Sequence, residues 1–320
     1  MTKPGITFGP VPSRRLGRSL GINNIPAKNC SYSCIYCQVG RTEQVRIERQ
    51  DFYPPEDIFQ DVRGRLERTG EAIDYLTFVP DGEPTLDVNL GQAISQLQTL
   101  RIPVGVITNS TLLWREDVRE ELGKADWVSL KIDAVDQGVW HRINQPHPTL
   151  RLSAILDGIR AFAQSFSGTL VTETMLVRGL NDTQECMQGV ADFLHALQPS
   201  RAYLSVPTRP PAEQWALSPD EETLNRMYQI LTKKMRQVEY LIGYEGIDFS
   251  FTGDVEQDLL NITAVHPMRE EAVNALLVRA GSSREVVERL VNRGDLKQIE
   301  YDGRIFYQRT FKKVYQTEKG

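Results

Sequence analysis

Short apolar runs alternate with longer segments of helical periodicity along most of this chain, and this alternation limits the folds open to it. The β-rich runs lie at 75–79, 104–108, 127–133, 169–177, 202–206 and 247–251, with another near Leu20–Asn23. Apolar residues at helical spacing occupy 55–69, 87–100, 115–123, 151–165, 183–197 and 219–237. Repeated strand–helix–strand order requires parallel strands with right-handed crossovers. The sequence therefore predicts an α/β fold, a partial parallel (β/α)6-type barrel.

The pattern changes after residue 264. Residues 267–281 and 282–294 have the spacing of two helices, each ended by a glycine. Two alternating strands then flank Asp302-Gly303, which is a strong hairpin signal. Helix, helix and hairpin predict a winged-helix-like module. We expect a barrel domain over 1–264 and this C-terminal module over 265–320.

Composition narrows the class of protein. The 320 residues are 40% hydrophobic and 25% charged, which is typical of a soluble globular protein. No apolar run reaches the ~18 residues of a membrane span, and the N-terminal segment lacks the apolar core of a signal peptide. We expect a cytoplasmic protein with no membrane partner. The net charge of -5 does not favour a dedicated nucleic-acid binder, although residues 266–320 carry eleven Lys/Arg against eight Asp/Glu.

Three of the four cysteines lie close together, at Cys30, Cys34 and Cys37. In a reducing cytosol, clustered thiols are metal or redox ligands more often than disulfides. Zinc sites normally have four protein ligands, but the fourth cysteine, Cys186, lies far along the chain and is expected to be an apolar helix residue. Three thiolates without a fourth predict a [4Fe–4S] cluster with one open iron.

The spacing C-x3-C-x2-C, with Tyr36 before the third cysteine, resembles the signature of the radical S-adenosylmethionine (SAM) superfamily. The resemblance implies that SAM binds the open iron. It also implies that the reduced cluster cleaves SAM to methionine and a 5′-deoxyadenosyl radical, which removes hydrogen from a substrate. A reducing electron donor of the flavodoxin or ferredoxin type is implied as a partner. The similarity covers about residues 6 to 255.

The segment after the strand at 75–79 resembles the G-G-E-P loop of this superfamily, with Asp81 in place of the first glycine. In relatives this loop binds the amino group of SAM. Tyr36 and four loop residues are therefore predicted cofactor contacts; the loop residues are Gly82, Glu83, Pro84 and Thr85. An ordinary strand-to-helix turn is the alternative.

Further polar residues lie near the C-terminal ends of predicted strands, where parallel barrels build their active sites. Asn109 is placed to bond the ribose or carboxylate of SAM, or simply to form a turn. Ser129, Lys131 and Asp133 share one face of a strand by the period of two. We expect these three to contact cofactor or substrate in a polar lumen.

The sequence does not show which face of the predicted strand at 169–177 points into the lumen. Thr172 and Thr174 share one side of this strand, and Glu173 lies on the other. Two further groups can reach the site: Thr208 and Arg209 after a later strand, and Arg14, Arg15 and Arg18 near the N-terminus. Arginines of this kind recognise carboxylate or phosphate, or hold a lid by surface ion pairs.

The segments GPVPSRRLGRSLGIN, DGEPTL, TETMLVRGLND and TRPP resemble a bacterial and archaeal branch of the superfamily that is similar to the enzymes making the tricyclic wyosine base of tRNA. The tricycle-forming enzyme tends to use a second cluster or a lysine that forms a Schiff base with pyruvate. This chain has too few cysteines for a second cluster, and Lys28 and Lys131 are its candidate central lysines.

An RNA base is the favoured substrate, with a protein or peptide second. The predicted recognition helix of the winged-helix-like module, 283–292, would offer RNA the side chains Arg284, Arg289 and Arg293. A purely structural or dimerising role for the module is the third possibility. The alternative to an enzyme is a non-catalytic iron–sulfur regulator.

Overall fold

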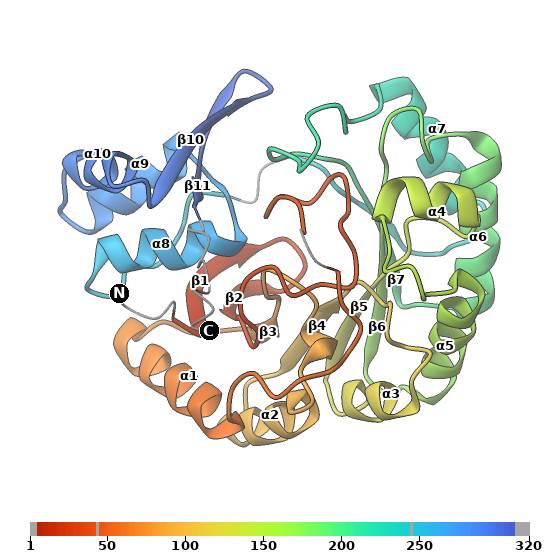
Figure 1. Ribbon diagram of the computed structural model, residues 1–320, viewed down its shortest axis with the longest axis horizontal. Helices are drawn as coiled ribbons and strands as arrows, with labels where there is room; N and C mark the ends of the chain where they lie inside the picture. Colours follow the sequence, from red (N-terminus) through yellow and green to blue (C-terminus); the bar gives the residue numbers. More distant parts are fainter. Residues whose placement is uncertain (1–4, 43–44, 244–245, 311–320) are drawn as a thin grey trace, which may run out of the picture.

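A computed structural model describes residues 5–42, 45–243 and 246–310. Within these ranges, eight strands form one curled sheet in the order β1 to β8 (Figure 1). β2 to β8 run parallel to one another, whereas β1 pairs antiparallel with β2. The strands are β1 (Thr7–Ser13), β2 (Gly17–Ile22), β3 (Tyr75–Phe78), β4 (Val104–Thr108), β5 (Trp127–Lys131), β6 (Thr169–Met175), β7 (Arg201–Ser205) and β8 (Val238–Leu241).

Helices connect the parallel strands and cover the outer face of the sheet (Figure 1). They are α1 (Pro55–Thr69), α2 (Leu90–Leu97), α3 (Glu116–Leu122), α4 (Gln137–Asn144), α5 (Leu152–Ser165), α6 (Gln184–Leu197) and α7 (Glu221–Thr232). The architecture is the predicted partial parallel barrel. Among the described residues, no helix combines the length and apolarity needed to cross a bilayer.

Local sequence signals set several helix ends. Thr183 caps α6 by accepting a hydrogen bond from the backbone N–H of Cys186, and Asp220 caps α7 in the same way. α1 begins with Pro55 in its first turn and ends at Gly70, whose φ of 58° suits a residue without a Cβ.

The structure departs from the sequence prediction at several elements. The segment 247–251 is not a strand: buried Phe249 packs in the core of the C-terminal module, while Ile247 is exposed. The eighth strand is instead β8, which directly follows the predicted helix 219–237; that helix ends earlier, at Thr232. α4 and the antiparallel β1 were also missed.

Two apolar layers flank the sheet. The larger lies between the sheet and the helices and takes in most of the buried Leu, Ile and Val side chains. The smaller fills the lumen and joins Trp127, Val171, Tyr203 and Leu241 with Leu16, which lies between β1 and β2. Because successive side chains of a strand point to opposite faces, every second residue of β5 to β8 faces the lumen. The apolar lumen layer closes one end of the barrel beneath the polar site described below.

The C-terminal part contains α8 (Val255–Val265), β9 (Met268–Arg269), α9 (Glu270–Arg279), α10 (Glu285–Asn292), β10 (Leu296–Tyr301) and β11 (Arg304–Arg309). Its three strands form a second sheet in the order β10–β11–β9. α8 packs against both β1 and β11 (Figure 1). Its Leu259 and Ile262 share one core with Leu276 and Leu290. The domain boundary near residue 264 and the winged-helix assignment stay predictions.

A candidate cofactor site at the C-terminal ends of the strands

A cavity of about 290 Å³ opens at the C-terminal ends of the parallel strands; we call it the central cavity. The strands contribute Thr108 from β4, Lys131 from β5, Glu173 from β6, Ser205 from β7 and Leu241 from β8. All three clustered cysteines line the same cavity. The barrel and the cysteine segment therefore share one site.

The segment carrying the cysteines is held in place by α4 and by the turn after β4. The backbone N–H groups of Ser33 and Ile35 donate to the carbonyls of Asn144 and Ile143, at 3.1 and 3.0 Å. The hydroxyls of Ser31 and Thr111 are 2.6 Å apart. These contacts fix the segment over the strand ends, although α4 was not predicted from the sequence.

The three thiols lie together at the wall of the central cavity. Among the described residues, no group of three or more His, Cys, Asp or Glu side chains is placed to hold one metal ion. All three cysteines border the central cavity, and cysteine thiolates are the usual ligands of iron–sulfur clusters. Amide groups approach two of the sulfurs, from Asn109 Nδ2 to Cys30 Sγ at 3.5 Å and from Asn144 Nδ2 to Cys34 Sγ at 3.4 Å.

Burial raises the pKa of the Cys34 thiol to about 12 and raises the pKa of Cys30 as well. Without a metal these thiols stay protonated, so a metal that bound them would have to displace their protons. Hydrogen bonds to the ligand sulfurs tune iron–sulfur sites, and the amides of Asn109 and Asn144 would make such bonds to a cluster held here.

The Asp81–Thr85 loop carries a fully oriented carboxylate. Glu83, 1% exposed, accepts hydrogen bonds from the hydroxyls of Thr85 and Thr108, both at 2.6 Å, and from the backbone N–H of Asn109 at 2.7 Å. Burial raises the pKa of Glu83, and these donors oppose that rise. Gly82 and Glu83 line the cavity, while Pro84 and Thr85 lie behind them. The loop thus presents one fixed acid to the cavity.

Gly82 is required by its surroundings. A Cβ at this position would lie 2.0 Å from the carbonyl oxygen of Asn29, so the loop passes too close to the cysteine segment for a larger residue. Asp81, at the place of the first glycine of the resembling motif, is 3% exposed, and its burial raises its pKa to about 6.

Tyr36 lies between the cysteines and β5. Its hydroxyl donates to the carboxylate of Asp133, and the ammonium of Lys131 lies 5.0 Å from its ring centroid. Asn144 Nδ2 donates to the same carboxylate at 2.8 Å. Tyr36 and Lys131 line the cavity, whereas Asp133 and Ser129 are buried outside its lining. Asp133 thus holds Tyr36 in position rather than facing the cavity.

Glu173 resolves the open question about β6: it faces the lumen. Its two oxygens accept from Lys131 Nζ at 2.9 Å and Arg15 Nη1 at 2.6 Å, and Ser205 Oγ donates at 2.9 Å. Burial disfavours the charged carboxylate, but Lys131 and Arg15 hold the pKa of Glu173 well below its usual range. On the same strand, Thr174 Oγ1 donates to the Ile132 carbonyl.

Lys131 is the cationic partner of this network. Burial opposes its charge, yet Glu173 and Asp133 raise the pKa of Lys131 above its ordinary value. The network shows why sequence reasoning missed the role of Glu173: alternation alone does not state which side of a strand is the lumen.

The remaining candidates separate into two groups. Arg14, Thr208 and Arg209 line the central cavity. Arg18 instead forms ion pairs with Glu71 and Asp248, at 3.1 and 3.4 Å. Cys186 packs half-buried against the main core on α6 and does not line the cavity.

Gln38 was not singled out from the sequence, yet it connects three elements at the edge of the site. Its side chain accepts from Arg209 Nη1 at 2.8 Å and donates to the Val265 carbonyl at 2.9 Å. Its own carbonyl accepts from Gln308 Nε2 at 2.6 Å. Its place directly after Cys37 was the only available signal.

A half-barrel that carries three cysteines over the ends of its strands defines an iron–sulfur enzyme scaffold. A model of the radical SAM superfamily matches residues 24–194. The chain belongs to the radical SAM superfamily. Members of this superfamily bind a [4Fe–4S] cluster and SAM, so these are the cofactors of this enzyme.

The comparisons also give individual relatives. UPF0026 protein MJ1312 of Methanocaldococcus jannaschii is 47% identical over 310 residues, which are 96% of this chain and 97% of that protein. The structure of TYW1 with a lysine-pyruvate adduct bound has a TM-score of 0.53 at 17% identity, covering 68% of this chain and 74% of that one. Streptococcus suis SuiB, bound to precursor peptide SuiA, has a TM-score of 0.53 at 13% identity and covers 70% and 49%. At these identities the two structures show a shared fold.

Proposed function

We propose that Cys30, Cys34 and Cys37 hold the cluster and that SAM binds between it and the strand ends, where the radical acts on a substrate. The observation that carries this proposal is that the three thiols, Glu83 and Asn109 border one cavity. The cluster, when reduced, supplies the electron that cleaves SAM to methionine and the 5′-deoxyadenosyl radical.

The Asp81–Thr85 loop would receive the ammonium group of SAM. Glu83 offers a carboxylate whose orientation is fixed by Thr85, Thr108 and the Asn109 backbone. A preorganised acid of this kind binds a cation without having to reorganise. Asn109 keeps its amide group at the cavity wall, within reach of a carboxylate or hydroxyl.

Lys131, Glu173 and Arg15 would bind the polar part of the substrate. They line the cavity beneath the thiols and form one network of ion pairs. A lysine that forms a Schiff base must be neutral to attack a carbonyl. Because Glu173 and Asp133 favour the ammonium form of Lys131, we assign it to electrostatic recognition rather than to Schiff-base formation.

We further propose that the substrate is an RNA base and that an electron-transfer protein of the flavodoxin or ferredoxin type reduces the cluster in the cytoplasm. The RNA assignment rests on the segments that resemble the wyosine branch and on exposed cations beside the site, described below. A peptide substrate is the second candidate, because SuiB, which shares the fold, was solved with its precursor peptide.

The test is reductive cleavage of SAM. The full chain is reconstituted with iron and sulfide without oxygen, mixed with dithionite and SAM, and assayed for 5′-deoxyadenosine by chromatography. The proposal predicts its formation at several times the level of an enzyme-free control. A protein that takes up four irons and forms none would instead behave as the iron–sulfur regulator.

A further inference from the structure

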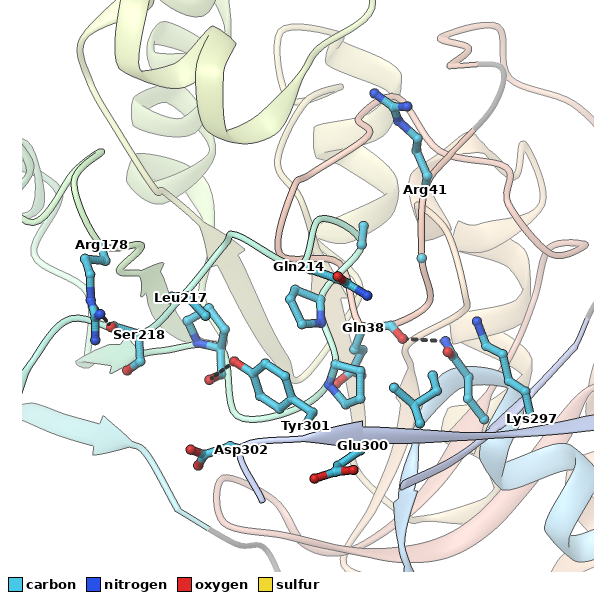
Figure 2. A pocket seen from close by; sticks show the side chains of 17 residues that line it. Gln38, Arg41, Arg178, Gln214, Leu217, Ser218, Lys297, Glu300, Tyr301 and Asp302 are labelled. Atoms are coloured by element: carbon cyan, nitrogen blue, oxygen red, sulfur yellow. Dashed lines mark hydrogen bonds between the residues drawn. The ribbon is translucent and has the colours of Figure 1, made fainter. Parts of the chain in front are cut away.

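A second, larger cavity of about 860 Å³ lies next to the central cavity; we call it the outer cleft (Figure 2). Its walls are residues 38–41 after the cysteines, residues from 207 to 218 after β7, and the β10–β11 hairpin. Gln38 and Pro207 line both cavities. A ligand in the outer cleft is therefore adjacent to the central cavity.

The hairpin forms a fixed wall of the cleft. Gln308 Nε2 donates to the carbonyl of Gln38 at 2.6 Å, and the Tyr301 hydroxyl donates to the carbonyl of Pro207 at 3.3 Å (Figure 2). Each contact ties the hairpin to one of the other two walls. The C-terminal part of the chain thus helps to build the cleft.

The two faces of the hairpin differ in what they contact. Lys297, Ile299 and Tyr301 alternate along β10 and all line the outer cleft. The other face carries Leu296 and Tyr307 into the core formed with α9 and α10. On the face toward the cleft, Lys297 is exposed and Tyr301 is half-buried, whereas Phe306 is buried.

Cations from three separate elements border the cleft: Arg41, Arg178 and Lys297, all exposed. Arg178 is oriented by a hydrogen bond from its Nε to the Ser218 carbonyl at 2.8 Å. Glu300 and Asp302 also border the cleft, near the hairpin turn, and Glu300 extends from β10 on the side away from Lys297 (Figure 2). Arg41 forms an ion pair with Glu213 at 3.4 Å, so Lys297 and Arg178 are the cations that the cleft offers to a ligand.

Aromatic rings accompany these cations. Tyr301 lines the cleft, with its hydroxyl held by Pro207. Trp215, 55% exposed, lies in the loop between the lining residues Gln214 and Leu217. Aromatic rings beside cations are the combination by which proteins hold single-stranded RNA, because bases stack on the rings while phosphates meet the charges.

The recognition helix suggested by the sequence lacks this character. On and beside α10, Arg284 pairs with Glu270, while Arg289 and Arg293 both pair with Glu256, at 3.8 and 2.6 Å. These acids offset the charge that the helix would offer to phosphates. The outer cleft is thus the better candidate for an RNA surface.

We propose that the outer cleft binds the sugar–phosphate chain of an unpaired RNA segment, with Tyr301 as a stacking platform, so that a neighbouring base enters the central cavity. This inference rests on the proposed function for its reaction. It assigns to the hairpin face and to Lys297 and Arg178 a binding role that the radical chemistry does not require.

Binding is tested with the full chain and fluorescein-labelled bulk tRNA by anisotropy, at several salt concentrations and without reductant. Tyr301→Ala is expected to weaken binding about tenfold, since stacking on one ring contributes roughly that much. Lys297→Ala is expected to lower the salt slope by about one, as loss of one phosphate contact does. Arg289→Ala, on α10, is the matched control and should bind like the wild type.

Tyr301→Phe separates stacking from the hydrogen bond to Pro207, because it keeps the ring and removes only the hydroxyl. It should retain most of the affinity for tRNA, and its melting temperature checks that the cleft wall is intact. Equal binding by Tyr301→Ala, Lys297→Ala and the wild type would overturn the proposal. So would tighter binding of a labelled polyglutamate peptide than of tRNA.

Failure of this inference differs from failure of the proposed function. Formation of 5′-deoxyadenosine together with unchanged tRNA binding in the cleft variants would refute the cleft alone. Cleft-dependent tRNA binding without 5′-deoxyadenosine would support the cleft and refute the reaction.

Discussion

The central cavity and the outer cleft lie side by side but are built differently. In the central cavity, Glu83 and Glu173 are buried, and each accepts hydrogen bonds from at least three groups. In the outer cleft, Lys297 and Arg178 are exposed to solvent. Buried, preorganised groups suit cofactors that always bind in one way. Exposed cations suit a long ligand whose charges remain hydrated. Changes in the two regions should therefore separate chemistry from substrate binding.

The largest effect is expected from Cys34→Ala in the central cavity. Losing one of three thiolates should remove stable cluster binding, and SAM cleavage should fall by about 100-fold or more. This loss exceeds the one typical of a residue that only hydrogen-bonds to a metal ligand. Iron and sulfide content, with visible absorbance, measures the cluster. Cys186→Ala, on α6 outside the cavity, is the matched control and should load normally. Binding of tRNA should survive in both variants; its loss in Cys34→Ala would show that the two regions are not separable.

Glu83→Gln comes next, because it replaces the acid that three donors orient. An amide cannot accept from all of these donors, so we expect a loss of about 2 kcal/mol in the free energy of unfolding. We also expect a KM for SAM raised by about tenfold or more, since the charge that meets the ammonium is gone. Urea unfolding and the SAM dependence of 5′-deoxyadenosine formation measure the two effects. Glu185→Gln on the exposed start of α6 should change neither, and a normal KM in Glu83→Gln would contradict the assigned role.

Lys131→Met leaves Glu173 with one cation fewer. Breaking a buried pair is expected to cost about 3 kcal/mol in unfolding free energy, and the pKa of Glu173 should rise. In the wild type the pKa of Glu173 is depressed. The ionised carboxylate therefore stabilises the fold fully at any pH above the pKa of an unfolded glutamate, and this stabilisation disappears only in strong acid. The variant should lose stability at a higher pH as the medium is acidified. The double variant Lys131→Met/Glu173→Met should recover part of the loss. If Lys131→Met kept the pH profile of the wild type, the network would not hold the charge of Glu173.

Gln308→Ala tests the connection between the regions. It removes the hydrogen bond from the hairpin to the Gln38 carbonyl, with an expected loss of about 1 kcal/mol. Because Gln38 directly follows Cys37, the reconstituted cluster should bleach faster in air, and tRNA affinity should fall a few-fold. Gln298→Ala, on the opposite face of β10, serves as control. Equal bleaching rates in the two variants would mean that the hairpin does not support the cysteine segment.

Asp81→Asn is expected to stabilise the apoprotein rather than weaken it. Burial raises the pKa of Asp81 to about 6, so the folded state holds this proton more tightly than the unfolded state. The carboxylate therefore costs stability as pH rises from about 4 to 6, and that cost is full above pH 6. Asparagine should stabilise the apoprotein by about 1–2 kcal/mol at pH 8 and by little at pH 4. The melting temperature at both pH values checks this; a variant that gains nothing at pH 8 would contradict it.

Much of this architecture follows from the sequence because βα alternation leaves few topologies. The segments 75–79, 104–108 and 202–206 correspond closely to β3, β4 and β7. The apolar residues at 247–251 wrongly predicted a strand, because Phe249 is buried against the C-terminal module and not within a sheet. β8 is four residues long and too short to give a clear pattern.

The site residues that belong to short sequence motifs could be predicted from the sequence. Those whose role depends on tertiary packing could not. The three cysteines lie together in one short segment and Glu83 lies in another, the Asp81–Thr85 loop, and each was found from its own motif. The partnership of Glu173 with Arg15 joins residues 158 positions apart and depends on which side of β6 faces the lumen. Gln38 depends on where the C-terminal hairpin docks. Neither relation is encoded in local periodicity.

A radical formed in the central cavity is expected to take hydrogen from RNA bound in the outer cleft. The most direct measurement uses tRNA carrying carbon-bound deuterium, incubated without oxygen with the reconstituted enzyme, reductant and SAM. Mass spectrometry of the 5′-deoxyadenosine should then show one transferred deuterium with the wild type and much less with Tyr301→Ala. Abundant 5′-deoxyadenosine without deuterium, from wild type that binds the tRNA, would contradict the claim.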